Sequence, residues 1–338
     1  MKNQADRHSK FGSRVQVFAS KVQSTARSTE SRGVFSELYL VKYGKLETVD
    51  GLDFTLPGDH KQTLRVLSGD RPDDFAVRIG GTMWNIPAWK GKIFPSKTPV
   101  KSFPLLYGKH FDTLELNATH YRIHPPETLQ KWASYVGDEF RFCPKFPQLI
   151  THFRRFNNCT GLTDEFIAAL LALEHKLGPS FIQLPPNFGL NSAQVLLDYL
   201  MQWPRELPLA IEFRHPDWFT PALAAEQVWQ AMEALGIGAV ISDTAGRRDA
   251  VHMRCTAPFL VLRFGGNNLH PSDSERIKTW IDRIDAWHQR GLREVYVLIH
   301  QPDSVNTPET ARDFGLALNA RMGVAVKTPQ LLTPHELF

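Results

Sequence analysis

The chain has 338 residues, of which 42% are hydrophobic and 22% are charged, and its formal net charge is +4. These fractions are typical of folded soluble proteins, so they exclude a disordered chain and allow a sizeable core. No apolar run approaches the roughly 20 residues that cross a bilayer, and the first residues lack the hydrophobic core of a signal peptide. We therefore expect a cytoplasmic protein with no membrane partner.

The cysteines support the same compartment. Cys143, Cys159 and Cys255 are isolated in the sequence, with no CxxC pair. This spacing argues against a disulfide scaffold and against a structural zinc site. A reducing compartment is the simplest interpretation.

The chain divides into three parts by composition. Residues 1–50 are basic and rich in Ser, Thr and Gln, with little hydrophobic periodicity, and such a stretch cannot bury enough apolar surface to fold. We expect a disordered or loosely ordered N-terminal extension there. Residues 51–75 carry enough Leu, Phe and Val to form a packing segment. No repeat or low-complexity linker divides residues 76–338, which we interpret as one domain.

From residue 76 the chain alternates short β-rich runs with amphipathic segments, the pattern of parallel βαβ units. Eight such units fit a closed barrel better than an open sheet, and no GxGxxG turn follows the first run, as a Rossmann domain would require. The sequence therefore predicts an α/β fold, a single-domain (β/α)8 TIM-type barrel. The expected strands are residues 76–80, 113–117, 140–143, 180–184, 209–213, 238–242, 259–264 and 294–300.

Two of the intervening helices carry clear end signals. Ser272 and Glu275 have the spacing of a capping box, and Gly291 supplies a stop, which predicts a helix over 272–291. Residues 163–177 show the same helical periodicity and are followed by Gly178. Such helices should cover the outside of the strands.

Polar side chains gather where the predicted strands end. In a parallel barrel all these ends open onto one mouth, where active sites of this architecture lie. The alternative is a set of ion pairs that only neutralise one another in the interior. Because the polar residues come from seven strands yet stand only at C-terminal ends, the pattern favours a functional pocket.

The residue types in this pocket suggest both catalysis and anion binding. The catalytic candidates are carboxylates that could act as general acid and base, with a histidine as proton shuttle, namely Glu115, Glu212, Asp243 and His300. Cations among carboxylates favour an anionic or phosphorylated ligand, because guanidinium groups bind such groups in a bidentate manner. The substrate-binding candidates are Asn117, Tyr121, Lys145, Gln183, Arg214, His215, Arg263, Trp84 and Asn267.

No HxH or HExxH spacing occurs, so no metal ligands are assigned and no cofactor is predicted. The carboxylates nevertheless leave a divalent metal ion open. The rings of Trp84 and Tyr121 could stack a base or a sugar, or only pack on the barrel rim.

Five blocks carry a family resemblance: HFDTLELNATHYR (110–122), FRFCPKFPQLITH (140–152), FIQLPPNF (181–188), IEFRHPDWF (211–219) and SDTAGRR (242–248). With them the chain resembles the YecE-like family, catalogued as domain of unknown function number 72. The resemblance implies an eight-stranded barrel. It implies no particular activity, because the function of that family is not established. Many members end the last strand with a run containing asparagine and aspartate, whereas this chain has His300-Gln301. The run GNNLHPSD (266–273), which follows Gly265, also sets it apart.

Three functions are consistent with these residues. The first is a hydrolase-like enzyme acting on a small anionic or phosphorylated substrate. The second is a glycoside hydrolase-like carboxylate pair. The third is a non-catalytic protein that binds nucleic acid or an anionic metabolite, because the chain is mildly basic. The sequence specifies no oligomeric state.

Overall fold

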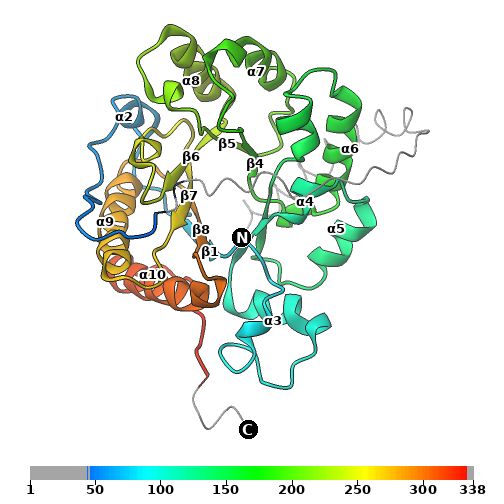
Figure 1. The fold of residues 1–338 in the computed structure, drawn as a ribbon, viewed down its shortest axis with the longest axis vertical. Helices are drawn as coiled ribbons and strands as arrows, with labels where there is room; N and C mark the ends of the chain where they lie inside the picture. Colours follow the sequence, from blue (N-terminus) through cyan, green and yellow to red (C-terminus); the bar gives the residue numbers. More distant parts are fainter. Residues whose placement is uncertain (1–43, 45, 333–338) are drawn as a thin grey trace.

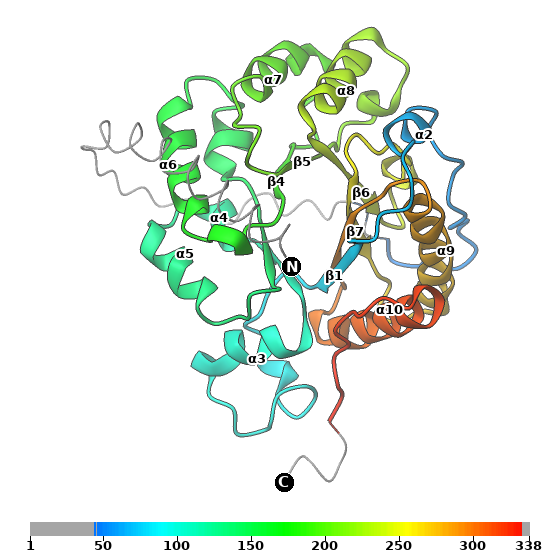
Figure 2. The same ribbon diagram turned by 180° about the vertical axis from the view of Figure 1, so that it is seen from behind.

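The computed structural model describes residues 44 and 46–332 and has a mixed α/β architecture. The helices lie around the outside of a central group of strands, in both views of the molecule (Figure 1; Figure 2). The N-terminal extension predicted for residues 1–50 falls almost wholly outside the described residues.

All eight predicted strands are confirmed, each to within one residue at either end. They are β1 (Ala76–Gly80), β2 (Thr113–Leu116), β3 (Arg141–Pro144), β4 (Ser180–Gln183), β5 (Leu209–Glu212), β6 (Gly238–Asp243), β7 (Phe259–Gly265) and β8 (Glu294–His300). Every pairing between neighbouring strands is parallel, as the alternation of strands and helices predicts.

The strands form two hydrogen-bonded sheets rather than the single closed sheet that the sequence predicts. One sheet has six strands in the order β1-β8-β7-β6-β5-β4, and β2 pairs with β3 in the other. The ladders are interrupted between β1 and β2 and between β3 and β4. Backbone bonds still cross both gaps. Between β1 and β2, Asp112 N donates to Ile79 O and Glu115 N to Gly81 O (both 3.0 Å), and between β3 and β4, Gly178 N donates to Phe142 O (2.8 Å) and Phe146 N to Phe181 O (2.9 Å).

The gap between β1 and β2 is held by a buried tyrosine. The Tyr107 hydroxyl donates to the Thr113 carbonyl oxygen (2.9 Å) and accepts from Gly81 N (2.8 Å). The two backbones approach so closely that a Cβ on Gly80 would overlap the Thr113 carbonyl oxygen. A glycine at this position is therefore required for the two sheets to meet.

The helices that cover the strands are α2 (Thr63–Val66), α3 (Phe103–His110), α4 (Ala118–Tyr121), α5 (Pro126–Ala133), α6 (Thr160–Leu171), α7 (Ala193–Leu200), α8 (Leu223–Leu235), α9 (Pro271–His288) and α10 (Thr307–Met322). The predicted capping box is wrong, because His270 rather than Ser272 caps α9 through its imidazole. The predicted helix over 163–177 also differs: α6 ends at Leu171, and a separate 3-10 turn follows before Gly178.

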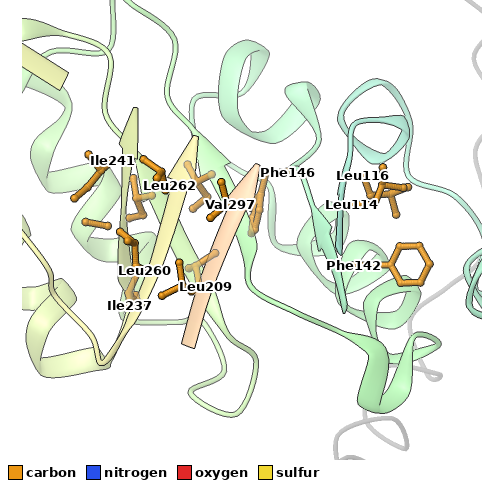
Figure 3. Packing of buried hydrophobic residues seen from close by; sticks show 14 of the residues in the cluster. Leu114, Leu116, Phe142, Phe146, Leu209, Ile237, Ile241, Leu260, Leu262 and Val297 are labelled. Carbon is orange, nitrogen blue, oxygen red and sulfur yellow. The ribbon is translucent and has the colours of Figure 1, made fainter. Parts of the chain in front are cut away.

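Buried apolar side chains pack on both faces of the strands. Between strands and helices, Ile241, Leu262 and Val297 gather on three neighbouring strands, and Leu114 and Phe142 lie on the two-stranded sheet (Figure 3). A second, smaller set packs on the opposite face. We call it the inner cluster, and it consists of Cys143, Phe181, Ala210, Val240, Val261, Tyr296 and Leu298. Its members come from β3 through β8, so these six strands turn one face toward a common interior.

The segment 51–75 packs on the outside of the strands near α9. Asp59 forms an ion pair with Arg283 of α9, the Thr63 hydroxyl donates to Met253 O (2.7 Å), and Leu67 is buried in the core. Within the described ranges, none of the helices combines the length and the apolar character that spanning a bilayer would require.

We predict that Tyr107→Phe destabilises the fold by about 1–3 kcal/mol, because it leaves the buried Gly81 N–H and Thr113 carbonyl without this partner. Urea denaturation followed by circular dichroism measures the change. Tyr135→Phe is the matched control, since its partly buried hydroxyl makes no hydrogen bond with any described residue. Equal stabilities of the two variants would contradict this role for Tyr107.

Candidate functional site

A ring of polar side chains lies directly above the inner cluster, at the C-terminal ends of the strands. Six of them follow an inner-cluster residue by two positions, as Gln183 follows Phe181 and Arg263 follows Val261, so they share its face. Glu115 likewise follows Thr113, whose hydroxyl contacts the Cys143 sulfur (3.4 Å). We call this set the polar layer, and it consists of Glu115, Lys145, Gln183, Glu212, Ser242, Arg263 and His300.

Arg263 lies at the centre of the layer and pairs with both buried carboxylates. Its Nε and Nη2 each donate to Glu115 (both 3.1 Å), and its Nη1 donates to Glu212 Oε1 (2.8 Å). These contacts reach from β7 to β5 in the same sheet and to β2 in the other. One guanidinium therefore joins the two sheets through side chains where the backbone ladders do not.

Neutral side chains complete the hydrogen bonding of the two carboxylates. Glu212 accepts from Gln183 Nε2 (2.5 Å) and from the Ser242 hydroxyl (2.7 Å), and Glu115 accepts from Asn117 Nδ2 (3.0 Å). Arg214, two positions beyond Glu212, places Nη2 3.5 Å from Glu212 Oε1. Both carboxylates are therefore fully buried without being left unsatisfied.

This environment keeps both carboxylates ionised. Burial alone would raise the pKa of Glu212, but the charges of Arg214 and Arg263 outweigh it and lower the pKa to about 2. The pKa of Glu115 is also held well below its usual value, because Arg263 and the hydrogen bond from His300 together exceed the effect of burial. A carboxylate with so low a pKa is a weak base and is not a proton donor at neutral pH.

The side chain of His300 is more exposed to solvent than those of Arg263, Glu115 and Glu212. Its Nε2 lies 2.8 Å from Glu115 Oε2 and 2.7 Å from Arg263 Nη2, while 33% of its side chain is exposed. Burial lowers its pKa further than the Glu115 carboxylate raises it, so the imidazole is neutral at neutral pH. A neutral histidine at the edge of a charged network can take up or release a proton.

Lys145 follows β3 and is the only buried lysine among the described residues, with 8% of its surface exposed. Its ammonium makes no hydrogen bond and no ion pair with any residue that the structure describes. Burial, together with the charges of Arg263 and Arg214, lowers its pKa to about 8 although Glu115 opposes the change. In the polar layer, the groups around Arg263 thus have hydrogen-bond and ion-pair partners, whereas the Lys145 ammonium has no ion-pair partner among the described residues.

Asp243 lies outside this layer. It follows Ile241, a residue of the helix-facing core, and its carboxylate pairs with Arg276 (3.0 Å) and Arg248 and accepts from the Trp280 indole (2.7 Å). The carboxylate is fully buried between β6 and α9. Of the three carboxylates grouped by the sequence, the structure brings together only Glu115 and Glu212.

The two aromatic candidates have different surroundings. Trp84 is buried in the helix-facing core, with its ring edge-on to Tyr107, Trp132 and Phe142. Tyr121 ends α4 and is 70% exposed. Within the described part of the chain, neither ring forms a hydrogen bond, ring pair or cation–π contact with the polar layer. Because Trp84 is buried, a stacking role is left to Tyr121.

His215 and Asn267 take positions that stabilise loops. The His215 imidazole accepts from Asp217 N (3.3 Å) and so caps a short 3-10 turn after β5. The Asn267 backbone N–H donates to the Asp273 carboxylate (2.8 Å), and its side-chain amide donates to the Ser272 hydroxyl (3.1 Å), both at the start of α9. Neither side chain has a hydrogen bond to the polar layer among those the structure describes.

The loop after β7 is tied to the residue that follows β8. Gln301 Oε1 accepts from Asn268 N (2.8 Å), and Gln301 Nε2 donates to the Thr310 hydroxyl of α10 (2.6 Å). Asn268 and Leu269 both have positive φ, of 55° and 65°. The GNNLHPSD loop and the residue after His300, both singled out by the sequence, are therefore in contact.

Three residues of the site were missed by sequence reasoning. Ser242 was passed over in favour of the charged Asp243, although counting two positions from Val240 would have placed it in the layer. His120 and His152 are not among the candidates that the sequence analysis names. Their rings pack edge to face 5.2 Å apart, and burial and the Lys145 charge lower their pKa values to about 3 and about 4. No sequence signal indicates that placement.

No group of three or more histidine, cysteine, aspartate or glutamate side chains could hold a metal ion within residues 44 and 46–332. The polar layer would also be a poor place for a cation, because its two carboxylates are already engaged by Arg263.

The family described as "Protein of unknown function DUF72" matches residues 78–334, more than half of the chain. The chain is 29% identical over 280 residues to the UPF0759 protein YecE of Escherichia coli (strain K12), covering 78% of this chain and 100% of that relative. It is 30% identical over 167 residues to the UPF0759 protein YunF of Bacillus subtilis (strain 168), covering 47% of this chain and 58% of that relative.

Two solved structures have a similar fold. A DUF72 family protein (EF0366) of Enterococcus faecalis V583 superposes with a TM-score of 0.57 at 19% identity, covering 76% of this chain and 100% of that one. A DUF72 family protein (TM1631) of Thermotoga maritima MSB8 gives a TM-score of 0.54 at 21% identity, covering 67% of this chain and 92% of that one.

We predict that the fold loses stability in acid as Glu212 and Glu115 become protonated. Because the folded pKa of Glu212 is about 2 and its ordinary value is 4.5, its contribution is complete above pH 4.5 and disappears as the pH falls through about 2. At neutral pH, Glu212→Gln should cost on the order of 3 kcal/mol, and the difference should shrink across that range. Urea denaturation at stepped pH measures it.

The matched control is Glu275→Gln on the exposed face of α9, which should show no such pH dependence. A constant stability difference between Glu212→Gln and the parent chain from neutral pH to about pH 2 would rule out the depressed pKa.

Proposed function

This chain belongs to the DUF72 family of proteins of unknown function, and from that premise we propose that it is a hydrolase-like enzyme that binds a small anionic or phosphorylated substrate at the polar layer. The observation that carries the proposal is Lys145, whose side chain is largely buried and whose ammonium has no ion pair with any described residue. A buried charge without a partner is costly, and an anionic ligand group would supply that partner.

We further propose that the eight strands enclose one interior, as a (β/α)8 barrel. The contacts of Arg263 with Glu115 and Glu212 support this, because they require β2, β5 and β7 to face the same centre. In such barrels, substrates bind at the C-terminal ends of the strands, where the polar layer lies. The free thiols of all three cysteines suit work in the cytoplasm.

In this proposal the residues have separate roles. Lys145 and Arg214 attract the anionic group, and Arg263 holds the two carboxylates in place. The low pKa values of Glu115 and Glu212 make either a poor general base, so proton transfer falls to His300, which is neutral and partly exposed. This differs from the expectation that a carboxylate is the base.

The two other functions have less support. A glycoside hydrolase needs one carboxyl group with a raised pKa to act as general acid, whereas those of Glu115 and Glu212 are both lowered. A nucleic-acid surface needs cations available to phosphates. The two arginines that follow β6 near the strand ends, Arg247 and Arg248, pair instead with Asp249 (2.7 Å) and Asp243.

We predict that Lys145→Met weakens binding of a small anion by about tenfold or more, equivalent to about 1.4 kcal/mol. Isothermal titration calorimetry with inorganic phosphate, followed by a panel of phosphorylated and carboxylated metabolites, measures the affinity. Lys278→Met, at an exposed position of α9, is the matched control and should bind as the parent does. Unchanged phosphate affinity in Lys145→Met would overturn the assignment of the anion site.

We also predict that His300→Asn lowers turnover of a phosphomonoester by about 100-fold or more while substrate binding changes little, because the proton-transfer group is lost and the cations remain. Steady-state kinetics on p-nitrophenyl phosphate separate the effect on kcat from that on KM. A variant that retains full kcat would exclude His300 as the proton-transfer group.

A further inference from the structure

We propose that the Lys145 amine is a nucleophile that forms a Schiff base with the carbonyl carbon of a small anionic aldehyde or ketone, such as a 2-oxo acid. This extends the proposed function, on which it rests for the location of the anionic group. In this arrangement Arg214 pairs with the anionic group of the substrate, and Lys145 faces its carbonyl.

The surroundings of Lys145 differ from those of an ordinary partly buried lysine. Lys176, for comparison, donates to the backbone carbonyls of Ala133 (3.0 Å) and Val136 (2.8 Å) and lies 3.5 Å from Asp138. Lys145 is buried at 8% exposure, yet its ammonium has no such bond to any described residue. The Lys145 nitrogen is not among the fully buried polar atoms that lack a partner, so the tip of this largely buried side chain reaches solvent and is open to a partner that arrives from outside.

The backbone of Lys145 is fixed on both sides. Its N–H donates to Leu116 O (3.3 Å) of β2, and its carbonyl accepts from the Thr119 hydroxyl (2.7 Å) of α4. A single bridge also pairs it with Phe181 of β4. The side chain therefore starts from a rigid position at the junction of the two sheets, as a nucleophile that must meet a bound substrate requires.

The charges around Lys145 favour the reactive, neutral form of its amine. Burial and the neighbouring Arg263 and Arg214 lower its pKa to about 8, against the opposing effects of Glu115 and Glu212. At neutral pH roughly a tenth of the amine is then unprotonated, compared with well under a hundredth for an ordinary lysine. Desolvation beside another cation is the usual way in which proteins activate such a lysine.

Two further titratable groups face Lys145, and both are neutral. His120 and His152 have pKa values lowered to about 3 and about 4, by burial first and then by the Lys145 charge. His120 Nδ1 donates to the Phe146 carbonyl (2.7 Å), so its proton is held there. Both imidazoles are therefore uncharged at neutral pH and do not offset the effect of Arg263 and Arg214 on the amine.

The covalent step balances without a further reactant. The Lys145 nitrogen lone pair forms a bond to the carbonyl carbon, and one amine proton passes to the carbonyl oxygen to give a carbinolamine. The carbon–oxygen bond then breaks, the oxygen takes a second proton from solvent and leaves as water, and an iminium ion remains. Addition of water to the iminium ion reverses these steps. A reductant is therefore needed to convert the intermediate into a stable product that can be detected.

The test uses the whole chain with pyruvate and sodium cyanoborohydride, which reduces the imine to a stable secondary amine. Intact mass spectrometry should show one adduct with the mass of pyruvic acid less one oxygen atom, and peptide mapping should place it on Lys145. Labelling should be at least about tenfold faster than at any other lysine and should rise with pH through about 8. Labelling spread evenly over the surface lysines would overturn the proposal.

Two variants keep the test interpretable. Lys145→Arg retains the positive charge and should bind phosphate but give no adduct, and its melting temperature checks that it is folded. Lys278→Arg, at an exposed site, should label as the parent does. An adduct of unchanged yield in Lys145→Arg would show that another lysine reacts and would overturn the assignment.

Binding of lactate, which carries the carboxylate but no carbonyl, separates this proposal from the proposed function. If phosphate and lactate bind and compete but pyruvate gives no adduct at Lys145, the Schiff base is overturned and the anion site stands. If neither anion binds and an adduct still forms at Lys145, the nucleophile stands and the anion site is overturned. If no anion binds and no adduct forms, both are overturned.

Discussion

The arrangement of the site depends on one guanidinium shared by two buried carboxylates. Arg263 neutralises Glu115 and Glu212 in a region that solvent barely reaches, and removing one partner from such a group leaves an uncompensated charge worth about 3–5 kcal/mol. The same contacts bring β2 to the six-stranded sheet, which no continuous backbone ladder does. Electrostatic pairing in the interior thus fixes both the geometry of the strands and the protonation states of the site.

This pairing also explains how the site divides between rigid and reactive groups. The two carboxylates are fully occupied, with pKa values too low for proton transfer, so they serve to orient Arg263 and its neighbours. The groups that remain chemically available lie around them: the partly exposed His300 and the unneutralised Lys145. The groups proposed to react are those that the hydrogen-bond and ion-pair network leaves accessible or unpaired, and the fully paired groups stabilise the fold.

Much of the fold and part of the site could be predicted from the sequence, because strands have a period of two. The apolar runs predict the eight strands, and they put Lys145 directly after one of them, at the end where the polar layer lies. The same period assigns Asp243 to the helix side, since it follows Ile241, and assigns Ser242 to the polar layer, since it follows Val240. Sequence reasoning that favours charged residues selects Asp243 and misses Ser242. The partnership of Arg263 with Glu115, 148 residues away, and the resulting pKa changes depend on closure of the strands and cannot be inferred from local pattern.

The bond between Gln301 and the loop after β7 has a consequence for how members of the family can be recombined. A Cβ on Gly266 would overlap the Gln301 amide, and the loop holds its left-handed turn at Asn268 through that same amide. A chimera that imports residues 265–273 without Gln301 would therefore lack the group around which the loop is folded. The two segments behave as a single exchangeable unit, and they should be inherited or engineered together.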